Sequence, residues 1–267
     1  MTGPDYRIDG LEPASDLVEE DFHTATLSDD MYTELASHHT KGNTFLLLYD
    51  STAVWGVPGT AEYVGMRVQR DLFEGTFAFE HIRQPTVPIT QNWLISRGCP
   101  PDAIELGAAP GPRPTDGLTS RLEDMLRANL GGRYTLLDHY THNPCSFNEG
   151  VEVSALVHDG HPDSAERPYR LFLEETSPSL ATYTVREGAF AGAEAADAWL
   201  RDRDTPLPLA PTPAPAPAPA PASNTVDRRA AAALIRTTTS ATASTQLPLP
   251  GVTAAPDTGL ARSRGLS

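Results

Sequence analysis

Residues 133–186 read RYTLLDHYTHNPCSFNEGVEVSALVHDGHPDSAERPYRLFLEETSPSLATYTVR and show the clearest pattern in the chain. Four runs rich in β-branched, aromatic and leucine residues are separated by Asn, Pro, Gly, Asp and Ser, which favour turns. The runs are Tyr134–Tyr140, Val151–Val157, Tyr169–Glu174 and Ala181–Arg186. The stretch therefore predicts an antiparallel β-meander.

Apolar residues alternate with polar ones in the second run, so we expect one apolar face that another element covers. Directly after the meander, Gly192–Arg203 places Ala195, Ala196, Trp199 and Leu200 at helical spacing. This segment predicts a helix on that face. The sequence thus favours an α+β fold, with a meander at about residues 133–186 and packed helices.

The residues before the meander predict further helices and strands of the same domain. Ser15 is positioned to cap a helix through Phe22, and Leu118–Leu130 carries the strongest apolar helical stripe. Expected strands are Thr44–Tyr49, Ala61–Arg70 and Thr76–Arg83, and further expected helices are Asp29–His38 and Thr90–Arg97.

Composition divides the 267 residues into a core and a tail. Residues 1–205 hold all the aromatic side chains and predict an acidic globular domain. In Pro206–Pro221 eight of sixteen residues are proline, so residues 206–222 predict a Pro/Ala-rich polyproline II linker. Residues 223–267, rich in Thr, Ser and Ala, predict a disordered tail.

The charge balance limits the partners of the domain. Residues 1–205 carry 33 Asp and Glu against 15 Lys and Arg, a net charge of −18. Such a domain repels phosphate backbones, so we expect no nucleic acid binding by it. Ten carboxylates precede residue 35, which predicts a solvated acidic surface. The alternative is a face resembling the DNA-mimicking anti-defence proteins of phages and plasmids.

Cysteine usage and hydropathy favour a cytoplasmic protein. Cys99 and Cys145 are the only cysteines, too few for a disulfide framework. No apolar stretch is long enough to cross a bilayer, so no membrane association is expected. Lys41 is the only lysine, and abundant Ala, Pro, Gly and Arg indicate a GC-rich bacterial genome.

Two His-x-x-His pairs, His139/His142 and His158/His161, raise the question of a zinc site. In a meander they lie at opposite ends of the strand between them, roughly 23 Å apart at about 3.3 Å per residue. One ion cannot bind both pairs, because zinc binds nitrogen at about 2.0–2.1 Å. We therefore expect no metal and no cofactor.

The same geometry predicts a different candidate site. The first and third connections of a meander share one end of the sheet, which brings Asn143–Gly150 close to Glu175–Leu180. A catalytic rim there would consist of His142, Cys145, Glu149 and Glu175. Cys145 beside His142 is a candidate activated thiolate, and the alternative is a polar loop.

Three short segments resemble known families. Gly188–Leu200, GAFAGAEAADAWL, resembles the strand-then-helix end of Arm-type DNA-binding domains of phage integrases, which implies a shared topology. Asp50-Ser51-Thr52 resembles the haloacid-dehalogenase pattern but lacks its second aspartate, so we interpret Asp50 as a turn former. Gln246, Leu247 and Leu249 resemble the short peptides by which replication and repair proteins bind the sliding clamp.

Two function classes remain. The leading hypothesis is a non-enzymatic macromolecular interaction or regulatory protein whose tail extends its reach, with an unknown protein partner and the sliding clamp as a candidate for the tail. The alternative is a hydrolase or transferase that uses the rim residues His142, Cys145, Glu149 and Glu175.

Overall fold

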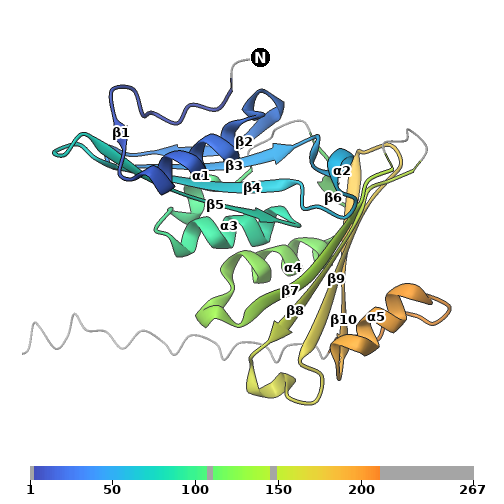
Figure 1. Cartoon of the computed structure of the whole chain (residues 1–267). Coiled ribbons are helices and arrows are strands. Elements are labelled where there is room, and N and C mark those ends of the chain that lie inside the picture. The colour runs from blue at the N-terminus through green and yellow to red at the C-terminus, as the bar shows by residue number, and fades with distance from the viewer. Residues whose placement is uncertain (1–2, 107–110, 145–148, 211–267) are drawn as a thin grey trace, which may run out of the picture. The chain divides into compact units, whose positions relative to one another are not determined.

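The computed structural model describes residues 3–106, 111–144 and 149–210 (Figure 1). The chain divides into two units, Met1–Thr212 and Pro213–Ser267, and all described residues belong to the first. They form two five-stranded, mostly antiparallel sheets with packed helices, which confirms the α+β class. The predicted linker beyond residue 210 and the predicted disordered tail lie outside the described residues.

The first sheet has the strand order β1-β5-β4-β3-β2. Its strands are β1 (Glu12–Pro13), β2 (Tyr32–His39), β3 (Asn43–Asp50), β4 (Tyr63–Asp71) and β5 (Thr76–Gln84). β1 is parallel to β5, and the other pairs are antiparallel. The helices are α1 (Asp16–Thr26), η1 (Asp29–Met31), α2 (Ala53–Gly56), α3 (Val87–Ser96) and η2 (Pro101–Ile104).

The second sheet has the order β6-β10-β9-β8-β7 and contains the predicted meander. Its strands are β6 (Arg113–Pro114), β7 (Tyr134–His142), β8 (Glu152–Asp159), β9 (Tyr169–Thr176) and β10 (Thr182–Phe190). The helices are α4 (Gly117–Ala128), η3 (Leu130–Gly132), η4 (Pro162–Ser164) and α5 (Ala193–Arg201). Each of the four predicted strand runs lies within a strand or one residue from it.

Both faces of each sheet are covered by helices, which corrects one expectation. Ala155 and Val157 of β8 pack against α4, through Leu122 and Leu126. α5 lies on the opposite face, where Leu156 meets the Ala196 cluster. The prediction that α5 covers an apolar face of the meander is thus correct for the face of Leu156, Leu171 and Leu173 and wrong for the face of Ala155 and Val157, because β8 is buried on both sides and alternation alone did not identify the covering helix.

The predicted helix over Asp29–His38 was also wrong. Only Asp29–Met31 is helical, and Tyr32–His39 is β2, paired with β3 along its length. Ser28 makes no side-chain capping hydrogen bond, so the helical start signal is absent. Pairing with the apolar strand β3 outweighed the helical spacing of Met31 and Leu35, as tertiary context often does.

The described residues contain an internal repeat. Residues 3–106, the first half, and residues 111–210, the second half, share the order β-α-β-β-β-β-α, with minor short helices added. In each half a two-residue strand runs parallel to the last long strand, with Pro13 opposite Phe77 and Pro114 opposite Tyr183. The two halves are thus copies of one topological unit.

Sequence details support this equivalence. β2 and β7 both begin Tyr-Thr and both carry a bulge at the same distance from their start. β3 and β8 have identical patterns of burial and both end in a buried aspartate. Trp-Leu-x-x-Arg begins in the last turn of both α3 and α5, and its arginine, just beyond the helix, lies over the tryptophan ring: Arg97 over Trp93 and Arg203 over Trp199.

The two halves meet through α3 and α4 (Figure 1). Asn92 Nδ2 of α3 donates to the backbone oxygen of Arg127 at 3.0 Å, and Arg127 Nε donates to Gln91 Oε1 at 2.8 Å. A second junction joins the residues before β4 to β7, where Thr141 N donates to Gly59 O at 3.2 Å. The hydrogen bonds at both junctions link the halves within one folded unit.

Candidate functional site

The repeat places one aspartate at the same position in each half. Asp50 ends β3 and pairs in register with Tyr32, and Asp159 ends β8 and pairs in register with Tyr134. Both carboxylates are buried. A buried charge is stable only when it is paired and hydrogen-bonded, so the partners of each aspartate show what it does.

Asp159 is enclosed by its partners. Arg133 donates to it twice, from Nε at 2.7 Å and Nη2 at 2.6 Å, and Ser164 Oγ donates at 2.5 Å. Arg170 Nη2 lies 3.3 Å away. Burial raises the pKa of Asp159, but these donors outweigh it and hold the pKa well below its usual range. The side chain of Asp159 is 0% exposed, so its role is to stabilise the fold.

Asp50 has fewer partners. Thr52 donates to Oδ1 from its backbone N at 2.9 Å and from Oγ1 at 2.8 Å, which confirms the interpretation of Asp50 as a turn former. Arg83 Nη2 donates to Oδ2 at 2.7 Å. Burial raises the pKa of Asp50, and the bonds from Thr52 and Arg83 lower it below the usual value. Asp50 is therefore an anchored, ionised carboxylate.

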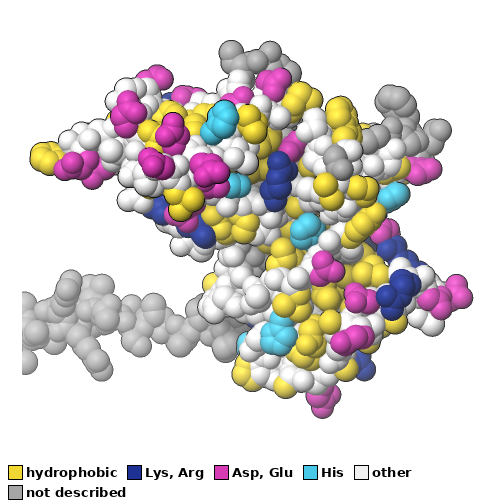
Figure 2. Space-filling view, in the orientation of Figure 1, with side chains coloured by type: hydrophobic (Ala, Val, Ile, Leu, Met, Phe, Trp, Pro, Cys, Tyr) yellow, Lys and Arg dark blue, Asp and Glu magenta, His cyan; other side chains and the backbone are white. Residues whose placement is uncertain are grey.

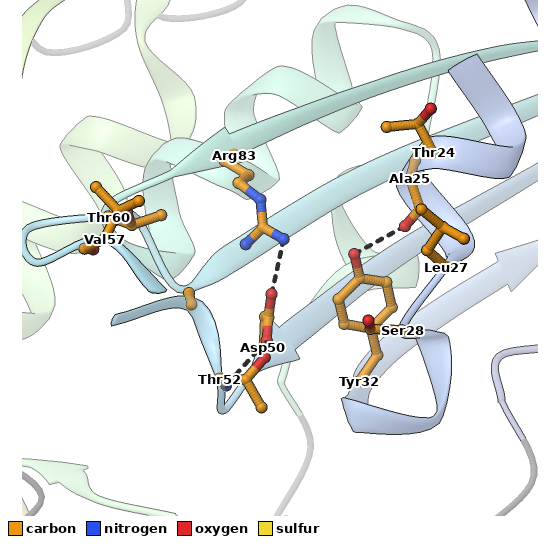
Figure 3. Close-up of a pocket in the computed structure, with 11 residues that line it drawn as sticks. Thr24, Ala25, Leu27, Ser28, Tyr32, Asp50, Thr52, Val57, Thr60 and Arg83 are labelled. Carbon is orange, nitrogen blue, oxygen red and sulfur yellow. Dashed lines mark hydrogen bonds and ion pairs between the residues drawn. The ribbon is translucent and has the colours of Figure 1, made fainter. Parts of the chain in front are cut away.

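Arg83 lines a cavity of about 310 Å³ (Figure 3). Its side chain is 37% exposed, whereas that of Asp50 is 6% exposed. The cavity is lined by the end of α1, by the start of β2, by the connection between β3 and β4, and by Arg83 of β5. Its lining residues are Thr24, Ala25, Leu27, Ser28, Tyr32, Asp50, Thr52, Ala53, Val57, Thr60 and Arg83. We call it the Arg83 cavity.

The mouth of the Arg83 cavity is apolar. Leu27 and Val57 line it and are 67% and 64% exposed, and Trp55 in the same connection is 68% exposed. Inside, Tyr32 OH donates to Ala25 O at 2.9 Å, which fixes the ring (Figure 3). Exposed large apolar side chains around a polar cavity are typical of interaction sites.

The connections that follow the two aspartates differ in length and account for part of the difference between them. Residues 160–168, nine in number, join β8 to β9 and turn back so that Ser164 and the His161 N–H reach Asp159. Residues 51–62, twelve in number, join β3 to β4 and form α2 instead. In the longer connection Thr52 donates to Asp50, and Trp55 and Val57 are exposed.

The predicted rim residues lie as follows. His142 ends β7, and Glu175 lies on β9; both pair in register with Glu152 of β8, which stands between them. Glu152 accepts two hydrogen bonds from Arg203, at 2.7 Å and 2.5 Å. Glu149 is exposed, and Cys145 lies outside the described residues. The start of β8 and the end of β9, which flank the two connections, lie side by side, since Thr176 N donates to Val151 O at 2.8 Å.

No group of three or more His, Cys, Asp or Glu side chains in the described parts of the chain is arranged to hold a metal ion. The two His-x-x-His pairs lie towards opposite ends of the β7–β8 pair, as the register of the strands shows. A different acidic group lies near the junction of the halves. Burial and the charges of Glu123 and Glu62 raise the pKa of Glu174 to about 8.

Sequence reasoning missed the Arg83 cavity. Asp50 was interpreted only as a turn former, and Arg83 lies 33 positions away on β5. The detectable signal was the repeat itself: an aspartate that ends a strongly apolar strand occurs at both Asp50 and Asp159, and each half begins its meander with Tyr-Thr. Comparing the two copies would have drawn attention to the connection after Asp50.

No protein-family model, curated protein or solved structure matches this chain. Among the residues that the structure describes, no helix has the length and hydropathy needed to cross a membrane.

Proposed function

We propose that this protein is a non-enzymatic interaction or regulatory protein that binds another macromolecule at the Arg83 cavity. One observation carries the proposal: of two equivalent buried aspartates, Asp159 is enclosed by its own half, whereas Asp50 and Arg83 face a cavity with an exposed apolar mouth. Tryptophan and arginine are the side chains that contribute most often to binding energy at protein interfaces.

The chemistry of the cavity favours binding over catalysis. None of the described residues that line it is a histidine or a cysteine. The hydroxyl of Thr52 donates to Asp50, and the hydroxyl of Thr60 donates to the backbone oxygen of Val57 at 2.7 Å. Asp50 is ionised and hydrogen-bonded, so it is a poor proton donor and its pKa is too low for an efficient base at neutral pH. Arg83 remains as a donor for an incoming acceptor group.

Site-specific photocrosslinking tests this proposal. A photoreactive amino acid replaces Trp55 in the full chain, in the cells that produce it, and a matched replacement of Leu130 is the control, because Leu130 is also exposed but lies in the second half. We expect one dominant adduct from position 55.

Binding measurements with the purified partner follow. Trp55→Ser and Arg83→Ala should each weaken binding about tenfold, as loss of a central anchor does, and Leu130→Ser should not. Equal adducts from both positions would contradict the proposal.

The alternative function is a hydrolase or transferase at the rim, with His142, Cys145, Glu149 and Glu175 in the site. Its support is that His142 and Glu175 lie on neighbouring parts of one sheet, on either side of Glu152. A screen of ester, thioester and phosphate substrates tests it, with Cys145→Ala and His142→Ala as the variants. Turnover that survives both substitutions would remove this alternative.

The tail provides a separate proposal, a contact of Gln246, Leu247 and Leu249 with the sliding clamp. Its support is the sequence of that segment, in which a glutamine precedes two leucines that an apolar cleft would accept. Fluorescence anisotropy of a labelled peptide covering residues 242–252 with purified clamp measures it. Binding that is unchanged when both leucines are replaced by serine would contradict it.

A further inference from the structure

The two halves carry their negative charge differently. Residues 1–106 contain 17 Asp and Glu and 6 Lys and Arg, a net −11, and residues 107–210 contain 16 and 9, a net −7. Residues 12–34, which include α1, hold eight carboxylates and no lysine or arginine. Figure 2 shows acidic side chains gathered over this part of the first half. The negative field is therefore concentrated beside the Arg83 cavity.

These carboxylates lack partners that neutralise them within the protein. Among the described residues, the only ion pair of the eight joins Asp21 to His81, at 3.5 Å. In the second half, by contrast, Asp116 pairs with Arg186 at 2.7 Å and Asp159 with Arg133 at 2.6 Å. Like charges without counterions destabilise a fold, so a partner that supplies cations gains binding energy here.

A second hollow on α1 lies next to the Arg83 cavity. It measures about 530 Å³ and is lined by Asp16, Glu19 and Glu20 together with Pro13, Phe22, His23 and Thr26. Thr24 and Ala25, on the last turn of the same helix, line the Arg83 cavity. Glu20 of this hollow and Thr24 of the Arg83 cavity are four residues apart and are therefore neighbours on the surface of α1, so the two hollows adjoin there.

The chemistry of this surface identifies its occupant. The mouth of the Arg83 cavity offers apolar contact area at Leu27 and Val57, Trp55 is exposed in the same connection, and Arg83 offers N–H donors. The adjoining hollow offers three carboxylates. An acidic peptide or a nucleic acid would be repelled by this field, and a neutral apolar segment would leave the carboxylates without counterions.

We infer that the partner presents a basic, amphipathic peptide segment, whose apolar side chains pack at the mouth of the Arg83 cavity and whose lysines or arginines contact Asp16, Glu19 and Glu20. This inference rests on the proposed function and names the chemistry of its partner. A backbone carbonyl of the segment accepts from Arg83, which discriminates against a segment held by charge alone.

Three fluorescein-labelled peptides test the inference with the full chain, by anisotropy at 50 and 300 mM NaCl. One alternates Lys and Leu, the second replaces Leu by Ser, and the third replaces Lys by Glu. We expect measurable binding of the Lys/Leu peptide only, weakened about tenfold at the higher salt because surface charges are screened. Trp55→Ser should weaken this binding and preserve its salt dependence.

A charge-matched pair of variants locates the contact. The triple variant Asp16→Asn, Glu19→Gln, Glu20→Gln should weaken binding about tenfold, because three exposed charge pairs are lost, and should reduce its salt dependence. The control Glu166→Gln, Glu194→Gln, Asp204→Asn changes net charge equally on exposed positions of the second half and should leave binding unchanged.

Three results would overturn the inference: equal binding of the Lys/Ser peptide, equal binding of the Glu/Leu peptide, or equal weakening by the control triple variant. Its failure is distinguishable from failure of the proposed function. If a partner crosslinks at position 55 through a segment without Lys or Arg, the proposed function is supported and the inferred chemistry of the partner is wrong. If no partner crosslinks at position 55 but the three peptides bind as expected, the proposed cellular function is wrong and the inferred preference for basic, amphipathic segments is supported.

Discussion

The first and second halves share one topology but use the same buried aspartate differently. Asp159 is held by Arg133 and Ser164, which makes it part of the scaffold. Asp50 is held by Thr52 and Arg83 beside an open cavity. A repeated unit can therefore keep its strands, bulges and helix positions while the partners of an equivalent buried aspartate, and the exposure of those partners, differ.

Removal of the Asp159 charge should produce the largest effect. Asp159→Asn leaves Arg170, which is 3% exposed, without its main counterion, so we expect a loss of about 3–5 kcal/mol in the free energy of unfolding. Asp50→Asn should cost only about 1 kcal/mol, because Arg83 is accessible to water. Urea denaturation of both variants measures the difference. Equal losses would show that the two aspartates are energetically equivalent.

The junction between the halves should show the next largest effect. Gly59 has a φ of +84°, and a Cβ there would lie 2.5 Å from Tyr140 Cδ2. We expect Gly59→Ala to lower the free energy of unfolding by about 2 kcal/mol. Gly10→Ala is the control, since Gly10 has a φ of +75° but open space around it, and should cost about 1 kcal/mol. Identical thermal shifts would exclude a contribution from the contact with Tyr140.

The acidic group near the junction should make stability depend on pH. The folded-state pKa of Glu174, about 8, exceeds its unfolded value, so the folded protein binds more protons and loses stability as pH rises from about 5 to 8. We expect a fall of about 1 kcal/mol, reduced from the full linkage value because the side chain is partly exposed. Glu174→Gln should flatten this slope in urea titrations between pH 5 and 9, whereas the exposed neighbour Glu175→Gln should not. A slope that persists in Glu174→Gln would assign it to another group.

The smallest effect concerns the arginines that lie over the repeated tryptophans. Arg97 is 3.7 Å from the centre of the Trp93 ring, and Arg203 is 5.6 Å from that of Trp199. We expect Arg97→Ala and Arg203→Ala each to cost about 0.5–1 kcal/mol, since both side chains are partly exposed. Thermal unfolding compares them. A substantially larger loss in one variant would show that the two stacks are not equivalent.

The sequence predicted local elements better than the site. The apolar stripe of Leu122 and Leu126 predicted α4, and Ser15 predicted the start of α1, where it accepts a hydrogen bond from Val18 N. These signals depend on residues within one or two helical turns. The predicted rim residues His142, Glu149 and Glu175 remain a prediction, and Cys145 lies outside the described residues.

The sequence by itself determined the α+β class, the meander and most helices, because hydrophobic periodicity and turn residues act over short distances. Only the tertiary structure decided that the elements form two equivalent halves and that Arg83 meets Asp50 beside a cavity. The physical reason is that strand pairing brings together residues far apart in the chain, and the path of the connection between β3 and β4 decides which of their polar groups remains accessible.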